Sequence, residues 1–154
     1  MYKLVTEQYL PINSAEAWKF FSSPGNLSRI TPPEMGFKIL TELKEREIYE
    51  GMQIGYRVRP LLGIPLKWIT RIGKTEPGKY FTDIQVRGPY KVWEHTHTFS
   101  GLNGGINMRD EVVYELPFGI LGRLMHKLFV RRKLNYIFEY RRSVLNKMFV
   151  NNAA

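Results

Sequence analysis

The chain of 154 residues contains no cysteine. Disulfide bonds, thiolate nucleophiles and thiolate metal sites are therefore excluded, and a reducing compartment, the cytoplasm, is the expected location. No apolar run approaches the roughly 18 to 20 residues needed to cross a bilayer. Residues 1–7 also lack the basic and apolar pattern of a secretory signal. We therefore expect a soluble cytoplasmic protein.

Internal repeats, low-complexity tracts and Pro/Ser-rich linkers are absent as well. The length fits one domain, and the 44% of hydrophobic residues supply enough apolar surface for one core. We expect residues 1–150 to form a single domain and residues 151–154 to be a disordered tail.

Acidic residues are scarce in one part of the chain. The formal net charge is +9, but residues 1–118 carry 15 basic and 13 acidic side chains, whereas residues 119–154 carry eight basic and one acidic. Such a segment can be a solvated helix face, can contact anionic lipids, or can track nucleic-acid phosphates, the last being the least expected. The predicted surface patch comprises Arg123, Lys127, Arg131, Arg132, Lys133, Arg141 and Arg142.

The first 30 residues predict one strand and two helices. Strand-forming residues alternate over residues 2–10, which end before Pro11. Asn13 or Ser14 can cap a helix that stops at residues 23–25. A short second helix is expected over residues 26–30.

The remainder predicts strands followed by a long helix. Turn residues separate six segments, which indicates an antiparallel meander. These are residues 37–40, 54–59, 66–73, 80–87, 91–100 and 106–116. After Pro117 the period becomes helical for about 30 residues. The expected apolar stripe comprises Leu121, Leu124, Met125, Leu128, Leu134, Ile137, Phe138, Val144, Leu145 and Met148.

Four strings in this order resemble the START-like group, the SRPBCC or polyketide cyclase/Bet v 1-like superfamily, and in particular a bacterial ligand-binding branch. They are PINSAEAWKFF at 11–21, NLSRITPP at 26–33, GPYKVWEHTHTF at 88–99 and RDEVVYELPFGILGRL at 109–124. The resemblance implies an α+β helix-grip fold. A curved antiparallel sheet of seven strands, in the order β-α-α-β6-α, would wrap around the C-terminal helix and enclose a cavity.

Strand alternation nominates the residues that would line this cavity. Aromatic residues on a strand face also pack in ordinary cores, so the two roles remain open. The candidates are Trp68, Trp93, His95, His97, Phe99, Met108, Asp110 and Tyr114.

His95, His97 and Asp110 are the candidate polar group. Hairpin pairing of their strands would bring Asp110 near one imidazole, where the carboxylate fixes the tautomer. This group can be a purely structural pair, can contact a ligand, or can act as a catalytic acid/base. The His95-x-His97 spacing also suits a metal, but no fourth ligand is evident, and we expect neither a metal nor another cofactor.

The main functional hypothesis is binding of a small, largely hydrophobic molecule such as a lipid, isoprenoid or polyketide-like compound. One alternative is a cofactor-free cyclase, hydratase or isomerase that uses Asp110 with His95 or His97. Another is an adaptor that binds protein or nucleic acid through the basic helix. Enzymatic activity is not the favoured hypothesis, and the sequence does not indicate an oligomeric state.

Overall fold

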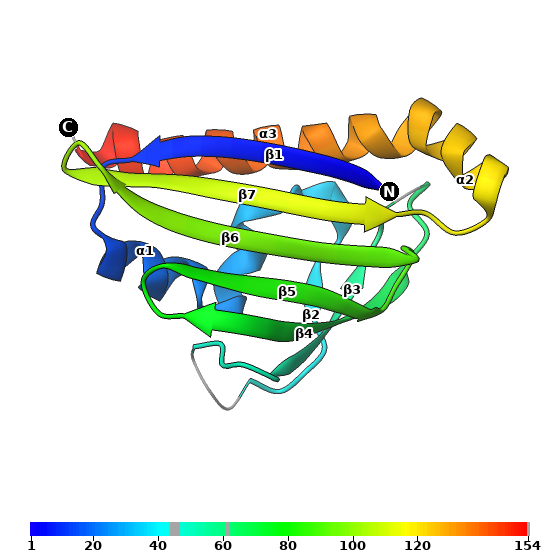
Figure 1. The fold of residues 1–154 in the computed structure, drawn as a ribbon, viewed down its shortest axis with the longest axis horizontal. Helices are drawn as coiled ribbons and strands as arrows, with labels where there is room; N and C mark the ends of the chain where they lie inside the picture. The colour runs from blue at the N-terminus through cyan, green and yellow to red at the C-terminus, as the bar shows by residue number, and fades with distance from the viewer. Residues whose placement is uncertain (44–46, 61, 154) are drawn as a thin grey trace.

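A curved antiparallel sheet and a long C-terminal helix dominate the computed structural model (Figure 1). The structure describes residues 1–43, 47–60 and 62–153. The strands are β1 (Tyr2–Leu10), β2 (Lys38–Ile39), β3 (Gln53–Val58), β4 (Leu66–Glu76), β5 (Tyr80–Arg87), β6 (Val92–Leu102) and β7 (Gly105–Glu115). The helices are α1 (Ser14–Phe21), α2 (Gly119–Met125) and α3 (Arg131–Leu145).

The strands form one sheet in the order β1-β7-β6-β5-β4-β3-β2. From β2 to β7, each strand pairs with the next one along the chain, as the predicted meander requires. β1 pairs with β7 instead, from Tyr2 opposite Tyr114 to Leu10 opposite Ile106. β6 and β7 place His97 directly opposite Asp110, so the predicted hairpin is confirmed.

α1 begins where the sequence indicates. The side chain of Asn13 accepts a hydrogen bond from the Glu16 amide, and the Glu16 carboxylate accepts one from the Asn13 amide. This reciprocal pair satisfies two amides that the first helical turn leaves free. The following segment, Pro24–Ile30, is a 3-10 helix rather than the expected second α-helix, and a further 3-10 turn spans Pro33–Met35.

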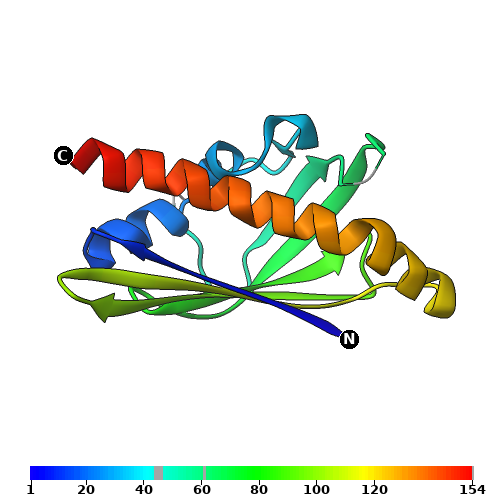
Figure 2. The ribbon, with the colours of Figure 1, turned by 90° about the horizontal axis from the view of Figure 1, so that it is seen from above.

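The C-terminal helix lies diagonally across the concave face of the sheet (Figure 2). Between α2 and α3, His126–Val130 form a π-helical turn. A second π-helical turn, Asn146–Val150, follows α3. Asn151–Ala153 then add a 3-10 turn where the sequence predicts a disordered tail. Ala154 lies outside the described residues.

The apolar stripe of the C-terminal helix is only partly used for packing. Leu134, Phe138 and Leu145 are buried against the sheet. Leu121, Leu124 and Leu128 are exposed, because α2 extends beyond the ends of the strands (Figures 1 and 2). The first turns of the expected apolar stripe therefore do not pack against the sheet. Among the described residues, no helix is both long and apolar enough to span a bilayer.

Two apolar clusters make up the core. One includes Phe99, Met108 and Leu145, and the other includes Trp93 and Val112. Along β6, β7 and α3, the residues between these clusters are polar. They are His95, His97, Asp110 and Arg141. The sheet and helix therefore hold a buried polar group at the boundary of the two clusters.

Candidate functional site

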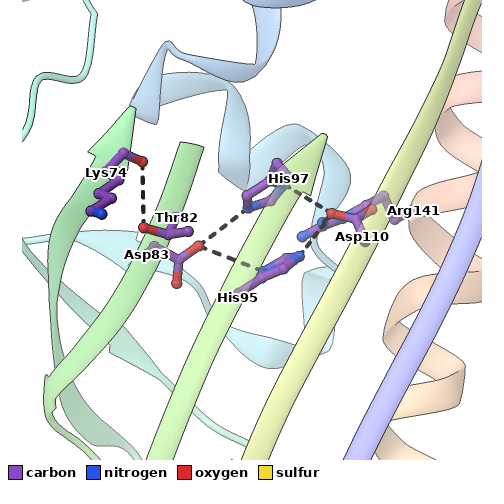
Figure 3. A network of polar contacts seen from close by, with 7 residues as sticks. All are labelled: Lys74, Thr82, Asp83, His95, His97, Asp110 and Arg141. Atoms are coloured by element: carbon purple, nitrogen blue, oxygen red, sulfur yellow. Dashed lines mark hydrogen bonds and ion pairs between the residues drawn. The ribbon is translucent and has the colours of Figure 1, made fainter. Parts of the chain in front are cut away.

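Two adjacent imidazoles between two carboxylates form the centre of the candidate site (Figure 3). His95 and His97 project from the same face of β6, with ring centroids 3.8 Å apart. Asp83 approaches them from β5 and Asp110 from β7. Alternate residues of a strand share a face, so the spacing of the two histidines places their rings side by side.

Asp110 makes the shorter contacts. Its Oδ1 lies 2.7 Å from Nε2 of His95 and 2.8 Å from Nδ1 of His97, although the latter pair lacks hydrogen-bond alignment. Nη1 of Arg141 lies 3.5 Å from the same oxygen. On the other side, Oδ2 of Asp83 lies 3.2 Å from Nε2 of His97 and 3.6 Å from Nδ1 of His95.

The charges in this group counteract the cost of burial. Burial alone would raise the pKa of Asp110, but Arg141 and His97 hold it well below its ordinary value. Burial would likewise raise the pKa of Asp83, which the hydrogen bond from His97 lowers. Both carboxylates are therefore ionised at neutral pH.

The two imidazoles differ in their tendency to bind a proton. Burial and the neighbouring His97 lower the pKa of His95. Burial also opposes the charged form of His97, but Asp110 and Asp83 outweigh it and raise the pKa of His97. His97 is therefore the imidazole of the pair that more readily binds an additional proton.

A cavity of about 180 Å³ lies against this group. Its wall is mainly apolar and includes Phe20, Leu27 and Val58, while Asp83 and His97 contribute polar atoms. A second cavity of about 130 Å³ is bordered by Tyr90, Val130, Lys133 and Phe138. Trp68, Trp93, His95 and Arg141 line both cavities.

The structure places the predicted cavity residues in three groups. Trp68, Trp93, His95 and His97 lie on the walls of the two larger cavities. Phe99 and Tyr114 are buried on the predicted face but line none of the three described cavities, because neighbouring aromatic rings pack against them. Met108 and Asp110 border only a third cavity of about 10 Å³. Phe99 and Tyr114 are therefore part of the packed core and do not line a described cavity.

Arg141 requires a correction. The sequence assigns it to the exposed basic patch, but its exposed fraction is 7%, and its guanidinium contacts the buried Asp110 and the ring of Phe138. The spacing from Leu134 through Phe138 to Leu145 places Arg141 on the buried helix face, where the paired carboxylate offsets part of its desolvation.

Two of the other patch residues contact the rest of the domain, since Lys133 borders the second cavity and Arg142 donates a hydrogen bond to the carbonyl of Glu7 on β1. Lys133 and Arg142 are half-buried, and the rest of the predicted patch is exposed: Arg123, Lys127, Arg131 and Arg132.

Asp83 was not among the predicted site residues. The strand Tyr80–Arg87 carries polar residues on both faces, so alternation does not identify the inward one. Its register opposite His95 places it in the site. His126 is buried, and its Nε2 lies 2.9 Å from the hydroxyl of Tyr114.

No protein-family model and no curated protein matches the chain. Several solved structures match the chain. Protein CV1439 from Chromobacterium violaceum is 14% identical with a TM-score of 0.70, and the match covers 97% of this chain and 98% of that one. Ara h 8.0201, a Bet v 1-like structure, is 14% identical with a TM-score of 0.61, covering 95% of this chain and 98% of that one.

A third similar structure is a larger protein. The nucleoside-diphosphate sugar epimerase from Corynebacterium glutamicum is 24% identical with a TM-score of 0.66, and the match covers 94% of this chain but 28% of that one. At these identities the similarity shows the fold. The chain has the helix-grip fold of the SRPBCC and Bet v 1-like structures, which confirms the fold predicted from the sequence.

Proposed function

We propose that the chain binds a small, largely apolar molecule between the sheet and α3. The observation that carries this proposal is the cavity of about 180 Å³, with its mainly apolar wall and its charged group. Together with the second cavity it reaches the lower end of the volumes, about 300 to 1,000 Å³, that small-molecule sites have. Storage, transport and sensing all require such binding.

The wall also indicates which chemistry the ligand carries. Apolar contact contributes about 25 cal/mol for each Å² removed from water, without fixing an orientation. Arg141 lines this cavity, and its Nε has no hydrogen-bond partner among the described residues. This donor favours a ligand with one acceptor group, such as a carbonyl or carboxylate, on an apolar body.

A bulky residue in the cavity tests this proposal. Val58 lines the cavity wall and is buried. Val58→Phe should occupy part of the cavity and weaken binding of the anionic apolar dye 1-anilinonaphthalene-8-sulfonate about 10-fold or more. Dye fluorescence titration gives the Kd, and circular dichroism shows whether the fold persists. Leu27→Phe, on another part of the same wall, is the alternative if Val58→Phe does not fold.

The matched control is Val86→Phe. Val86 is exposed on β5, so the same added volume lies in solvent and the dye affinity should stay within about twofold. Equal dye affinity in folded Val58→Phe, Leu27→Phe and unmodified protein would refute the proposal. Native mass spectrometry of the purified protein then identifies the molecule that co-purifies with it.

We infer a second function for the first turns of the C-terminal helix, contact with an anionic membrane surface. Large apolar side chains are exposed here on consecutive turns, whereas single exposed apolar residues are the norm on soluble proteins. Phe118 is 80% exposed, Ile120 76% and Leu121 60%. Leu124, Leu128 and Phe129 continue this apolar surface.

Charge and backbone geometry favour a lipid partner. Arg123, Lys127, Arg131 and Arg132 are exposed in the same segment, and residues 119–138 contain no acidic residue. Each cation near an anionic surface contributes about 1 kcal/mol. Phe118 adopts a φ of +69°, which is strained for a bulky residue. Packing of its ring in the core does not offset this strain, because the side chain is exposed.

The location of the segment relates the two proposed functions. Val130 and Lys133, at the C-terminal end of this segment, line the second cavity. A membrane contact at α2 would therefore bring a cavity wall close to the lipid surface, as collection of an apolar molecule from a bilayer requires.

Vesicle sedimentation tests the membrane proposal. Unmodified protein should bind vesicles of phosphatidylserine and phosphatidylcholine, with binding that weakens as salt rises. Phe118→Asn should reduce binding about fivefold or more while leaving the fold intact, since asparagine tolerates positive φ. Tyr49→Asn, at an exposed aromatic residue elsewhere, is the control that should bind normally. Binding that is absent, or insensitive to both salt and Phe118→Asn, would refute this function.

A further inference from the structure

We propose that Asp83, His95 and His97 form a binding site for a divalent transition-metal ion, with a ligand set that suits Zn²⁺. The three side chains offer one ligand atom each, and these atoms all lie within 4.8 Å of one another. Two imidazoles and one carboxylate are an established set for a metal with an open position. The site does not depend on whether an apolar molecule occupies the cavity.

The distances on the Asp83 side also fit a bridging ion, which would replace the hydrogen bond between His97 and Asp83. Oδ2 of Asp83 lies 3.2 Å from Nε2 of His97 and 3.6 Å from Nδ1 of His95. Hydrogen bonds between such groups are normally shorter, about 2.7 to 2.9 Å when charge assists them. Two ligands held about 2.0 to 2.1 Å from a tetrahedral Zn²⁺ are about 3.3 Å apart, which falls between the two observed distances.

Asp110 supplies the outer support that metal-binding imidazoles use. A ligating histidine normally donates its other ring N–H to a carboxylate or carbonyl, which fixes the tautomer and ring orientation. The nitrogens that face away from Asp83 are Nε2 of His95 and Nδ1 of His97. They lie 2.7 Å and 2.8 Å from the same oxygen of Asp110. Of these two contacts, that of His95 has hydrogen-bond alignment and that of His97 does not, so Asp110 orients His95 by a hydrogen bond and contacts His97 through its charge.

The arrangement also leaves access for a further ligand. Asp83, His95 and His97 all contribute to the wall of the 180 Å³ cavity. Water or an acceptor group of a molecule in that cavity would fill the remaining coordination position. The three ligands come from the paired strands β5 and β6, in which Asp83 lies opposite His95, so the sheet itself fixes their spacing.

The charge of the group favours a cation. Around the two rings lie two carboxylates, those of Asp83 and Asp110, but one guanidinium, that of Arg141. Arg141 does not occupy the proposed position, because its Nη1 contacts Asp110, on the far side of the imidazoles (Figure 3). A cation between Asp83 and the two rings therefore lies next to the carboxylate of Asp83 and not next to the guanidinium of Arg141.

Metal binding to the full-length, untagged protein tests the proposal. After dialysis against chelator, the protein should bind Zn²⁺ in a 1:1 ratio by calorimetry and mass spectrometry, and its Tm should rise because binding stabilises the folded state. Asp83→Asn and His97→Gln should each abolish this 1:1 binding at micromolar Zn²⁺. His126→Gln is the control, since it removes a buried histidine outside the site and should leave the stoichiometry at one.

Pulsed electron paramagnetic resonance of the unmodified protein with Cu²⁺ provides a readout that does not require a variant to fold. The spectrum should report two coordinated imidazoles. Absence of 1:1 Zn²⁺ binding, fewer than two imidazoles on Cu²⁺, or 1:1 binding that survives in folded Asp83→Asn and His97→Gln would each overturn the proposal. Dye binding that persists in these variants would leave the apolar cavity function standing on its own.

Discussion

Asp110 presents one carboxylate oxygen to two imidazoles and a guanidinium in a buried position. Replacing it with asparagine keeps the volume but removes the charge that pairs with Arg141. We expect Asp110→Asn to lower the free energy of unfolding by about 3 to 5 kcal/mol, since it leaves a buried cation without its carboxylate. Urea denaturation followed by circular dichroism measures this loss.

Glu111 provides the control from the same strand. It faces the other side of β7 and pairs with Lys3 and Arg109 in a partly exposed position. Such pairs contribute roughly 0 to 1 kcal/mol, so Glu111→Gln should change stability by no more than that. Equal losses in the two variants would show that burial of the Asp110 pair carries no special cost.

His126 predicts a dependence of stability on pH. Burial and the nearby Arg131 lower its pKa from the ordinary value of 6.5. The unfolded chain therefore binds this proton more readily than the folded one, so the contribution of His126 is complete above pH 6.5 and is lost as the pH falls towards the folded-state pKa.

His126→Gln should therefore flatten the decline in stability below pH 6.5. Urea midpoints between pH 5 and 8 measure the slope, and the difference from the unmodified protein should be largest at the acidic end. An unchanged slope would mean that His126 does not titrate differently in the folded and unfolded states.

The sequence identified most of the buried polar group but not all of it. His95, His97 and Asp110 followed from strand alternation and hairpin pairing, because both rules act locally. Arg141 was assigned to the surface on its charge alone, although its spacing from Leu134 and Phe138 matches the buried face. The place of Asp83 in the site depends on the register between β5 and β6. The alternation of faces along a single strand does not determine that register.

At the scale of single elements, Gly122 governs how α2 follows β7. A Cβ at this position would lie 2.1 Å from the carbonyl oxygen of Pro117, a backbone atom that cannot move aside easily. We expect Gly122→Ala to destabilise the protein by about 1 to 3 kcal/mol despite the better helix propensity of alanine. The shift of the urea midpoint gives the value.

Gly25→Ala is the matched substitution. A Cβ there meets nothing within 4 Å, and the backbone is not in the left-handed region. Its stability should stay constant or rise by up to about 1 kcal/mol, because alanine restricts the unfolded chain. A similar loss in both variants would contradict the clash at Pro117.

Strands were easier to predict than the helices that precede and follow them. Tyr2–Leu10 and Tyr80–Arg87 have the predicted bounds, since Pro11 follows the first segment and turn residues flank the second on both sides. Residues 26–30 lack enough local signal to separate an α-helix from a 3-10 helix. In the C-terminal helix, amphipathicity revealed an apolar face but did not reveal where the sheet ends and that face becomes exposed.

The division of the core into two clusters is a property of the whole molecule. Ile106 belongs to one cluster and Val112 to the other, about 20 Å apart along β7 at roughly 3.4 Å per residue. Ile106→Val should cost about 0.5 to 1.5 kcal/mol, and Val112→Ala somewhat more, because two methyl groups are lost. The losses should add in the double variant to within about 0.5 kcal/mol.

A double-mutant cycle from urea denaturation measures the sum. Coupling above about 1 kcal/mol would show that the polar group transmits strain between the clusters instead of separating them. In that case, filling one cavity would also change the stability of the residues around the other.

The pairing of β1 with β7 has a consequence for how the chain reaches this structure. Roughly 100 residues separate the partners in that pair, from Leu10 and Ile106 to Tyr2 and Tyr114. A ribosome adds about 5 to 20 residues each second, so β1 leaves the ribosome some 5 to 20 s before its partner is made. Its nine residues, with alternating half-buried positions, stay unpaired during that interval. The first strand synthesised is thus among the last to join the sheet, and chaperone binding to the nascent chain is expected to concentrate there.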